Sequence, residues 1–149
     1  MKIAFDLDNT LLRCGFDFEL EKPISQLLSL IFGGEKLRKG TKEIFSFCKS
    51  NQYETWIYTS SMRNVFYIRK IFWLNGIFLD GIVNYQVHHK HIKKNITKYP
   101  PYFGIDVLID DSEGVRIEAE KNNFKVIIIQ PNNPNWVENI KDELLKINK

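Results

Sequence analysis

The chain has 149 residues, of which 44% are hydrophobic and 26% are charged. This balance is typical of a single globular domain and excludes a disordered chain, and the apolar runs are much shorter than the roughly 20 residues that span a bilayer. The net charge of +3 is by itself too small to indicate a nucleic-acid-binding protein. A strand-like pattern begins at the N-terminus and the two cysteines lack metal-site or disulfide spacing, so we expect a cytoplasmic protein with reduced thiols and no membrane contact.

Apolar runs and helical patterns alternate along the chain. In chain order, the expected elements are a strand at 2–7, a helix at 35–50, a strand at 55–59, a helix at 61–75, strands at 78–83 and 106–109, a helix at 112–123, a strand at 124–129 and a helix at 135–147. Between the first strand and the first long helix, residues 11–34 are expected to form a small flap strand at 15–23 and a short helix at 24–32. Thr41 is expected to cap the main part of the following helix.

The expected strands are almost continuously apolar, which is typical of strands buried on both faces. Their alternation with helices predicts an α/β protein with a three-layer, doubly wound, Rossmann-like fold, in which helices cover both faces of a parallel five-stranded sheet. No linker or repeat interrupts the pattern, so residues 1–149 are expected to form one domain. The insertion at 11–34 is too short for a full cap domain and provides only the small flap.

Three of the expected strands end in polar residues. These residues are Asp6 and Asp8 in the segment DLDNT, Thr59 in the segment TSS, and Asp110 and Asp111 in the segment DDS. Because ligands of such sheets bind at the carboxyl ends of the strands, the five side chains are expected to meet at one edge. Several carboxylates gathered there need a compensating cation, and Mg²⁺ is the hard cation that suits oxygen ligands and phosphate chemistry.

The order and spacing of these segments resemble the motifs of the haloacid dehalogenase-like (HAD) superfamily of phosphohydrolases. The first motif of that superfamily, Asp-x-Asp-x-Thr after the first strand, is matched by Asp6, Asp8 and Thr10. Its second motif, a Ser or Thr at the end of a hydrophobic strand, is matched by Thr59, and its fourth, an acidic pair after another strand, is matched by the DDS segment. The match extends over nearly the whole chain, to about residue 130.

The resemblance implies a role for each acidic residue. Asp6 would be the nucleophile that forms an aspartyl-phosphate, and Asp8 would protonate the leaving oxygen and then activate water. Asp6, Asp111 and the main-chain carbonyl of Asp8 would hold Mg²⁺, while Asp110 would support that metal shell or steady a lysine. Thr10 would support the site.

The third motif of the superfamily is a lysine upstream of the acidic pair. We favour Lys98, because the two prolines that follow it are expected to hold the chain extended on its way into the fourth strand. Three other lysines stay open as alternatives: Lys90, Lys93 and Lys94. The lysine, together with Thr59 and Ser60, would bind the phosphoryl oxygens.

Other interpretations of these segments explain less. An EF-hand calcium loop needs a glycine where Leu11 stands and a glutamate where Asp17 stands, and a receiver domain has its acidic pair after the first strand. His88, His89 and His91 invite a zinc site, but no fourth ligand is near, so a solvated basic turn is favoured.

The sequence therefore predicts an Mg²⁺-dependent phosphomonoester hydrolase that acts through an aspartyl-phosphate, since an acid at position 8 favours rapid turnover of that intermediate. An open site favours large or exposed phosphorylated substrates, so binding energy would come from such a substrate or from a second subunit of a homo-oligomer. The substrate classes considered are a small molecule, a phosphopeptide and a nucleic-acid end. The lysine-rich segment 90–98 is interpreted as a solvated face rather than a nucleic-acid patch. The alternatives are a non-catalytic module that binds metal and phosphate, and a phosphotransferase.

Overall fold

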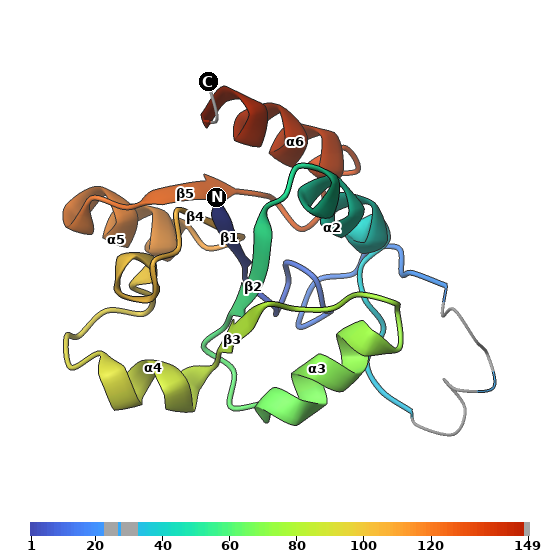
Figure 1. Ribbon diagram of the computed structural model, residues 1–149, viewed down its shortest axis with the longest axis horizontal. Helices are drawn as coiled ribbons and strands as arrows, with labels where there is room; N and C mark the ends of the chain where they lie inside the picture. Colours follow the sequence, from blue (N-terminus) through green and yellow to red (C-terminus); the bar gives the residue numbers. More distant parts are fainter. Residues whose placement is uncertain (23–26, 28–32, 148–149) are drawn as a thin grey trace.

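Five parallel strands form the central layer of the molecule (Figure 1). The structure is a computed structural model that describes residues 1–22, 27 and 33–147. The strands are β1 (Lys2–Phe5), β2 (Glu54–Tyr58), β3 (Gly81–Val83), β4 (Val107–Asp110) and β5 (Lys125–Ile128). They lie in the order β3-β2-β1-β4-β5, and every neighbouring pair is parallel. The predicted α/β fold with a doubly wound, Rossmann-like sheet is confirmed.

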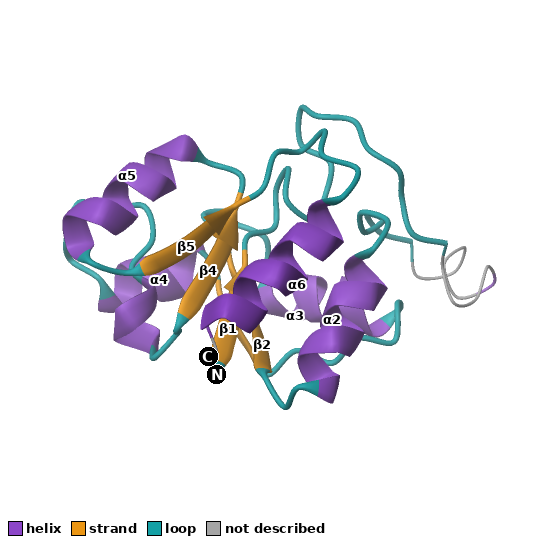
Figure 2. Ribbon diagram, turned by 90° about the horizontal axis from the view of Figure 1, so that it is seen from above, coloured by secondary structure: helices purple, strands orange, loops and turns teal. Residues whose placement is uncertain are grey.

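Helices cover both faces of this sheet. Figure 2 shows α2 (Thr41–Ser50), α3 (Val65–Trp73) and α6 (Trp136–Ile147) on one side, and α4 (Tyr85–His91) and α5 (Glu113–Asn122) on the other. Alternate residues of each strand point into one of two apolar cores, because successive side chains of a strand face opposite ways. Phe5 and Ile57 belong to the core beneath α2, α3 and α6, whereas Ala4, Tyr58 and Leu108 belong to the other core.

The strand order reverses beside β1, and this places the ends of β1 and β4 at the switch point of the sheet. From β1 the chain moves outward to β2 and β3, and then returns to form β4 and β5 on the opposite side. Phe5 lies opposite Ile109 in the register, and the amide of Asp6 donates to the carbonyl of Ile109 at 2.8 Å. The residues that follow these two strands therefore start from adjacent backbone positions at the crevice where such sheets bind ligands.

Two helices begin later than the sequence predicts. The start of α2 at Thr41 follows Gly40, whose φ of 93° belongs to the left-handed region that glycine tolerates, and the Thr41 hydroxyl donates to the carbonyl of Arg38 at 2.6 Å instead of capping the helix. The start of α3 at Val65 follows Asn64, whose side chain accepts from the amide of Phe66 at 2.8 Å. Residues 35–40 and 61–64 are left as loops, and both loops reach the edge of the sheet that holds the polar strand ends.

Three further expectations about local structure are wrong or fall outside the described chain. The Pro100–Phe103 segment is a 3-10 helix rather than extended, because its prolines occupy the first helical positions that tolerate a missing N–H. The expected flap strand at 15–23 is reduced, in its described part, to a single bridge between Leu20 and Arg38. The short helix expected at 24–32 lies outside the described residues, apart from Leu27. None of the described helices is both long and apolar enough to cross a membrane.

Candidate active site

A buried lysine lies between two carboxylates at the switch point of the sheet. Asp6 follows β1 and is only 6% exposed, and Asp110 ends β4 and is 1% exposed. The ammonium of Lys98 donates to Asp6 Oδ1 and, at 2.6 Å, to Asp110 Oδ2, and Lys98 itself is 3% exposed. Because charges out of contact with water are costly unless they are paired, the two buried carboxylates depend on the ammonium of Lys98.

A third carboxylate completes the group. One oxygen each of Asp6, Asp110 and Asp111 lie within 4.8 Å of one another. Asp111 accepts a hydrogen bond of 3.3 Å from the hydroxyl of Thr10, and Asp110 Oδ1 accepts one of 2.9 Å from the amide of Ser112. We call Asp6, Asp110 and Asp111 the acidic cluster. Three carboxylates and one ammonium, when all are ionised, leave two negative charges, which a divalent cation would balance.

Burial and mutual repulsion oppose ionisation of the acidic cluster. Burial raises the pKa of Asp6 to about 7, with Lys98 lowering it and Asp110 raising it further. The pKa of Asp111 is also raised, by burial and then by Asp110. Burial alone would lower the pKa of Lys98, but the two carboxylates beside it outweigh this effect, so the net pKa is raised and the amine stays charged. The cluster thus offers hard oxygen ligands that, when ionised, carry two negative charges not balanced by Lys98. This donor set fits Mg²⁺.

The loop that carries Lys98 is fastened on both sides of that residue. Glu118 on α5 accepts hydrogen bonds from the amides of Thr97 at 3.0 Å and Lys98 at 3.4 Å. On the other side, the amide of Tyr99 donates to the hydroxyl of Tyr58, the last residue of β2, at 2.8 Å. Because the backbone is fixed at residues 97 to 99, the lysine side chain enters the cluster from a defined position.

The three histidines are arranged differently from the sequence prediction. A solvated basic turn is expected there, and this prediction is wrong, because they lie on α4 and His88 is buried. His88 Nδ1 is hydrogen-bonded to the hydroxyl of Tyr58 at 2.6 Å, and the same hydroxyl accepts from the amide of Tyr99. His88, His89 and His91 do not form a metal-ligand group among the described residues.

The carboxylate of Asp8 is not one of the three that lie within 4.8 Å of one another in the acidic cluster. Its two oxygens accept hydrogen bonds of 2.7 and 2.9 Å from Arg63, which the sequence reasoning missed. The only sign of Arg63 in the sequence is its place four residues after Thr59, where the chain leaves the sheet edge. The side chain of Asp8 is therefore not grouped with those of Asp6, Asp110 and Asp111, and its expected metal ligand, the main-chain carbonyl, stays a prediction.

Thr59 and Ser60 follow β2 at the same edge of the sheet. Thr59 is buried, its amide donates to the carbonyl of Val83 at 2.8 Å, and its hydroxyl accepts from the amide of Ser61 at 3.1 Å. Ser60 is exposed. The hydroxyl of Thr59 thus closes the turn after the strand, and phosphate binding by either residue stays a prediction.

A second buried cation that the sequence reasoning missed supports the rim near Asp111. The guanidinium of Arg38 donates to the carbonyls of Pro131 at 2.8 Å and Asn133 at 2.9 Å, and it stacks 4.7 Å from the ring centroid of Trp136. Burial lowers the pKa of Arg38 to about 10, against the opposing effect of Asp111. Arg38 therefore joins the segment before α2 to the loop between β5 and α6.

No family model and no curated protein matches this sequence. Solved structures do match, over nearly the whole chain. A HAD-superfamily hydrolase of subfamily IA, variant 1, from Geobacter sulfurreducens aligns with a TM-score of 0.58 and 13% identity over 96% of this chain and 95% of that chain. A predicted phosphatase from Clostridium acetobutylicum aligns with a TM-score of 0.55 and 17% identity over 98% and 96% of the two chains. The chain has a HAD-like fold.

A third structure agrees with this result. A predicted HAD-like family hydrolase from Porphyromonas gingivalis aligns with a TM-score of 0.53 and 16% identity over 96% of this chain and 97% of that chain. The predicted resemblance to the HAD superfamily is therefore confirmed at the level of the fold. In this HAD-like fold, the structure brings Asp6, Asp110, Asp111 and Lys98 together at the switch point.

The other lysines considered for the third motif lie away from the acidic cluster in the HAD-like fold. Lys93 donates to the carbonyl of His89 at 3.1 Å, and Lys94 lies 4.6 Å from the ring centroid of Tyr99. Lys90 is exposed on α4. Of the four lysines that the sequence leaves open, Lys98 is the one that contacts the cluster.

Proposed function

We propose that this protein is an Mg²⁺-dependent phosphomonoester hydrolase that works through an aspartyl-phosphate on Asp6. The observation that supports it most is the buried contact of Asp6 with Lys98, inside a group of three carboxylates at the switch point of a HAD-like fold. A carboxylate in such a place is costly to keep and has no role in the core. The energetic cost of burying this carboxylate is explained if Asp6 is a nucleophile whose negative charge is balanced by bound Mg²⁺.

Each residue of the site then has a chemical task. Asp6, Asp111 and the carbonyl of Asp8 would hold Mg²⁺, which when bound neutralises charge on the phosphoryl oxygens. Asp6 attacks phosphorus while the bond to the leaving oxygen breaks, and Asp8 gives that oxygen a proton. The ammonium of Lys98 and the hydroxyls of Thr59 and Ser60 would donate to the phosphoryl oxygens and stabilise the charge that spreads over them.

The substrate that we propose is a phosphate monoester on an accessible group of a small molecule, a phosphopeptide or a nucleic-acid end. The insertion after β1 is short, so much of the affinity is expected from the phosphate itself or from substrate outside the site, or from a second subunit. A panel of these three phosphoester classes, compared by kcat/KM, would identify the preferred one.

Hydrolysis of 4-nitrophenyl phosphate tests the proposal. We expect turnover with Mg²⁺, none with EDTA, and recovery when Mg²⁺ is returned in excess. The Asp111→Asn variant, which lacks one charge of the acidic cluster, should need about tenfold or more Mg²⁺ for half-maximal rate with a smaller change in the rate at saturation. Binding of Mg²⁺ without turnover across the substrate panel would instead indicate a binding module, and activity only with an added alcohol would indicate a phosphotransferase.

Mg²⁺ binding should also depend on pH, because a carboxyl group must lose its proton before it binds a cation. Burial raises the pKa of Asp6 to about 7, so protons compete with the metal below that pH. We expect the apparent affinity, measured by titration calorimetry, to fall by up to about tenfold per pH unit below pH 7 and to level off above it. An affinity that is the same at about pH 6 and about pH 8 would show that Asp6 is not a ligand.

A further inference from the structure

Arg63 links two carboxylates that come from distant parts of the chain. Its Nη1 donates to both oxygens of Asp8 at 2.7 and 2.9 Å. Its Nε and Nη2 donate to the two oxygens of Glu35 at 2.8 and 2.7 Å. The pKa of Arg63 is raised, most by the hydrogen bonds with Glu35, so the guanidinium is a permanent cation. This planar fork can hold two carboxylates in fixed directions, which a lysine cannot do.

The backbone and the side chain of Arg63 are both anchored. Ser61 Oγ accepts from Arg63 Nη1 at 2.8 Å and from the Arg63 amide at 3.2 Å. The carbonyl of Arg63 accepts from the side chain of Asn84, a buried residue that follows β3, at 3.0 Å. Arg63 is half-buried, and its position is therefore determined by the sheet edge on one side and by the two carboxylates on the other.

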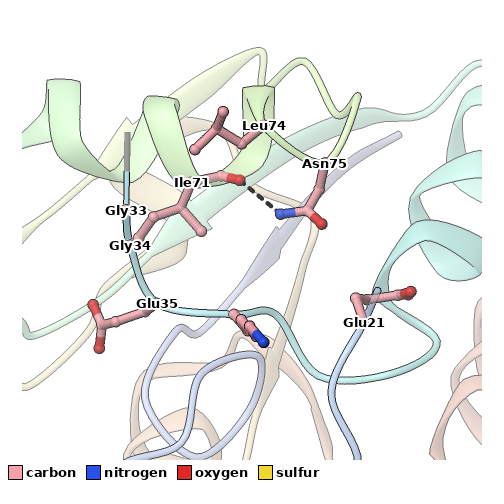
Figure 3. A pocket seen from close by; sticks show the side chains of 8 residues that line it. Glu21, Gly33, Gly34, Glu35, Ile71, Leu74 and Asn75 are labelled. Atoms are coloured by element: carbon pink, nitrogen blue, oxygen red, sulfur yellow. Dashed lines mark hydrogen bonds between the residues drawn. The ribbon is translucent and has the colours of Figure 1, made fainter. Parts of the chain in front are cut away.

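Glu35 approaches this arginine from the segment that precedes α2. Figure 3 shows Gly33, Gly34 and Glu35 beside the C-terminal half of α3, where they line a small cavity with Ile71 and other residues. The Glu35 carboxylate has both oxygens on Arg63. Glu35 thus serves as a brace that keeps the guanidinium facing Asp8.

The consequence of this arrangement is a separation of the acidic side chains. Asp8 is two residues from Asp6, close enough in the chain for its carboxylate to join the acidic cluster as a fourth member. Lys98 holds Asp6 and Asp110, whereas the side-chain hydrogen bonds that Asp8 accepts within the described chain come from Arg63. Two cations therefore divide the carboxylates into a group that can bind metal and a single carboxylate outside it.

We propose that Arg63, braced by Glu35, is the positioning residue for Asp8: it keeps that carboxylate out of the acidic cluster and available as the proton acceptor for water. The inference rests on the proposed function. In the step concerned, a water oxygen forms a bond to the phosphorus of the aspartyl-phosphate and gives a proton to Asp8. The bond between phosphorus and the Asp6 oxygen breaks, its electron pair returns to Asp6, and inorganic phosphate is released.

The kinetic test uses 4-nitrophenyl phosphate, whose leaving group departs readily, so that its kcat/KM reports the first step with little need for Asp8. In the Arg63→Gln variant, we expect kcat to fall about 10- to 100-fold, KM to fall with it, and kcat/KM to stay within about threefold. The phosphorylated enzyme should accumulate, as measured by intact-protein mass spectrometry after acid quench. A fall in kcat/KM without such accumulation would mean that Arg63 binds the substrate phosphate, and would overturn the proposal.

Combined variants test whether Arg63 acts through Asp8. Adding Arg63→Gln to Asp8→Asn should change kcat by less than about twofold, because the partner through which the arginine acts is already lost. Independent, multiplying effects would refute the proposal. Arg63→Lys should stay impaired, since one ammonium cannot hold both carboxylates, and full recovery by lysine would also refute it. Arg69→Gln on the exposed face of α3 is the matched control and should behave as wild type.

A measurement without turnover separates this inference from the proposed function. In Arg63→Gln, the released Asp8 carboxylate can approach the acidic cluster, so calorimetry should show tighter Mg²⁺ binding, by about threefold or more. The gain should be smaller when Asp8→Asn is also present. The inference would be overturned if Arg63→Gln raised the Mg²⁺ affinity equally with and without Asp8→Asn, or did not raise it at all. If wild type binds Mg²⁺ but hydrolyses nothing, the proposed function fails, and this comparison still decides whether Arg63 keeps Asp8 apart.

Discussion

Replacement of Asp6 by Asn is expected to abolish Mg²⁺-dependent hydrolysis of 4-nitrophenyl phosphate, with kcat reduced by at least about 1,000-fold. The amide has nearly the shape of the carboxylate but cannot accept a phosphoryl group in the same way. No phosphorylated protein should be detectable by mass spectrometry. Full activity in the purified variant would refute Asp6 as the nucleophile.

For the stability of the same variant we expect no such loss. Burial raises the pKa of Asp6 to about 7 in the folded protein, compared with an ordinary value of 3.8. The contribution of Asp6 to stability is therefore fully present below about pH 4 and is lost as the pH rises through about 7, where the buried group must ionise. At about pH 8 with EDTA, Asp6→Asn should thus unfold at a temperature no lower than wild type. Asp142→Asn, an exposed change of the same kind on α6, should leave both activity and stability unchanged.

Replacement of Lys98 by Met is expected to lower the free energy of unfolding more than any other variant proposed for this site. Lys98 is buried against Asp6 and Asp110, so its removal leaves two buried carboxylates without a cation. Breaking such a pair on one side costs about 3–5 kcal/mol of the free energy of unfolding. We expect this loss in urea unfolding at about pH 8 with EDTA, and partial recovery with Mg²⁺, which would supply positive charge to the same oxygens.

The pH dependence of the stability loss in Lys98→Met distinguishes uncompensated charge from a simple loss of packing. Protonation of Asp6 removes one of the two uncompensated charges, so the deficit of Lys98→Met should shrink as the pH falls toward about 5. The variant can also be studied at that pH if it does not fold at higher pH. Lys90→Met, which changes an exposed lysine of α4, should alter stability by less than about 0.5 kcal/mol. A deficit below about 1 kcal/mol, or one that does not vary with pH, would contradict the role given to Lys98.

Local sequence patterns determine the fold and the edge at which the acidic residues lie. The buried strands are marked by continuous apolar residues, and their alternation with helices leaves few topologies besides a doubly wound parallel sheet. Once the strands are parallel, Asp6 after β1 and Asp110 at the end of β4 must lie at the same edge. The helix boundaries were less predictable, because they depend on single residues such as Gly40 and Asn64 rather than on periodicity.

Only the tertiary structure decides which charged side chains meet. Lys98 and Asp6 are 92 residues apart and Arg63 and Asp8 are 55 apart, and no local pattern says where a long side chain leaving a loop will end. The sequence favours Lys98 but leaves three other lysines open. In the folded chain, Glu118 and Tyr58 fasten residues 97 to 99 and thereby place Lys98 against the acidic cluster. The physical reason is that a period in the sequence fixes which face of a helix or strand is buried, whereas pairing of buried charges depends on contacts made after the chain has folded.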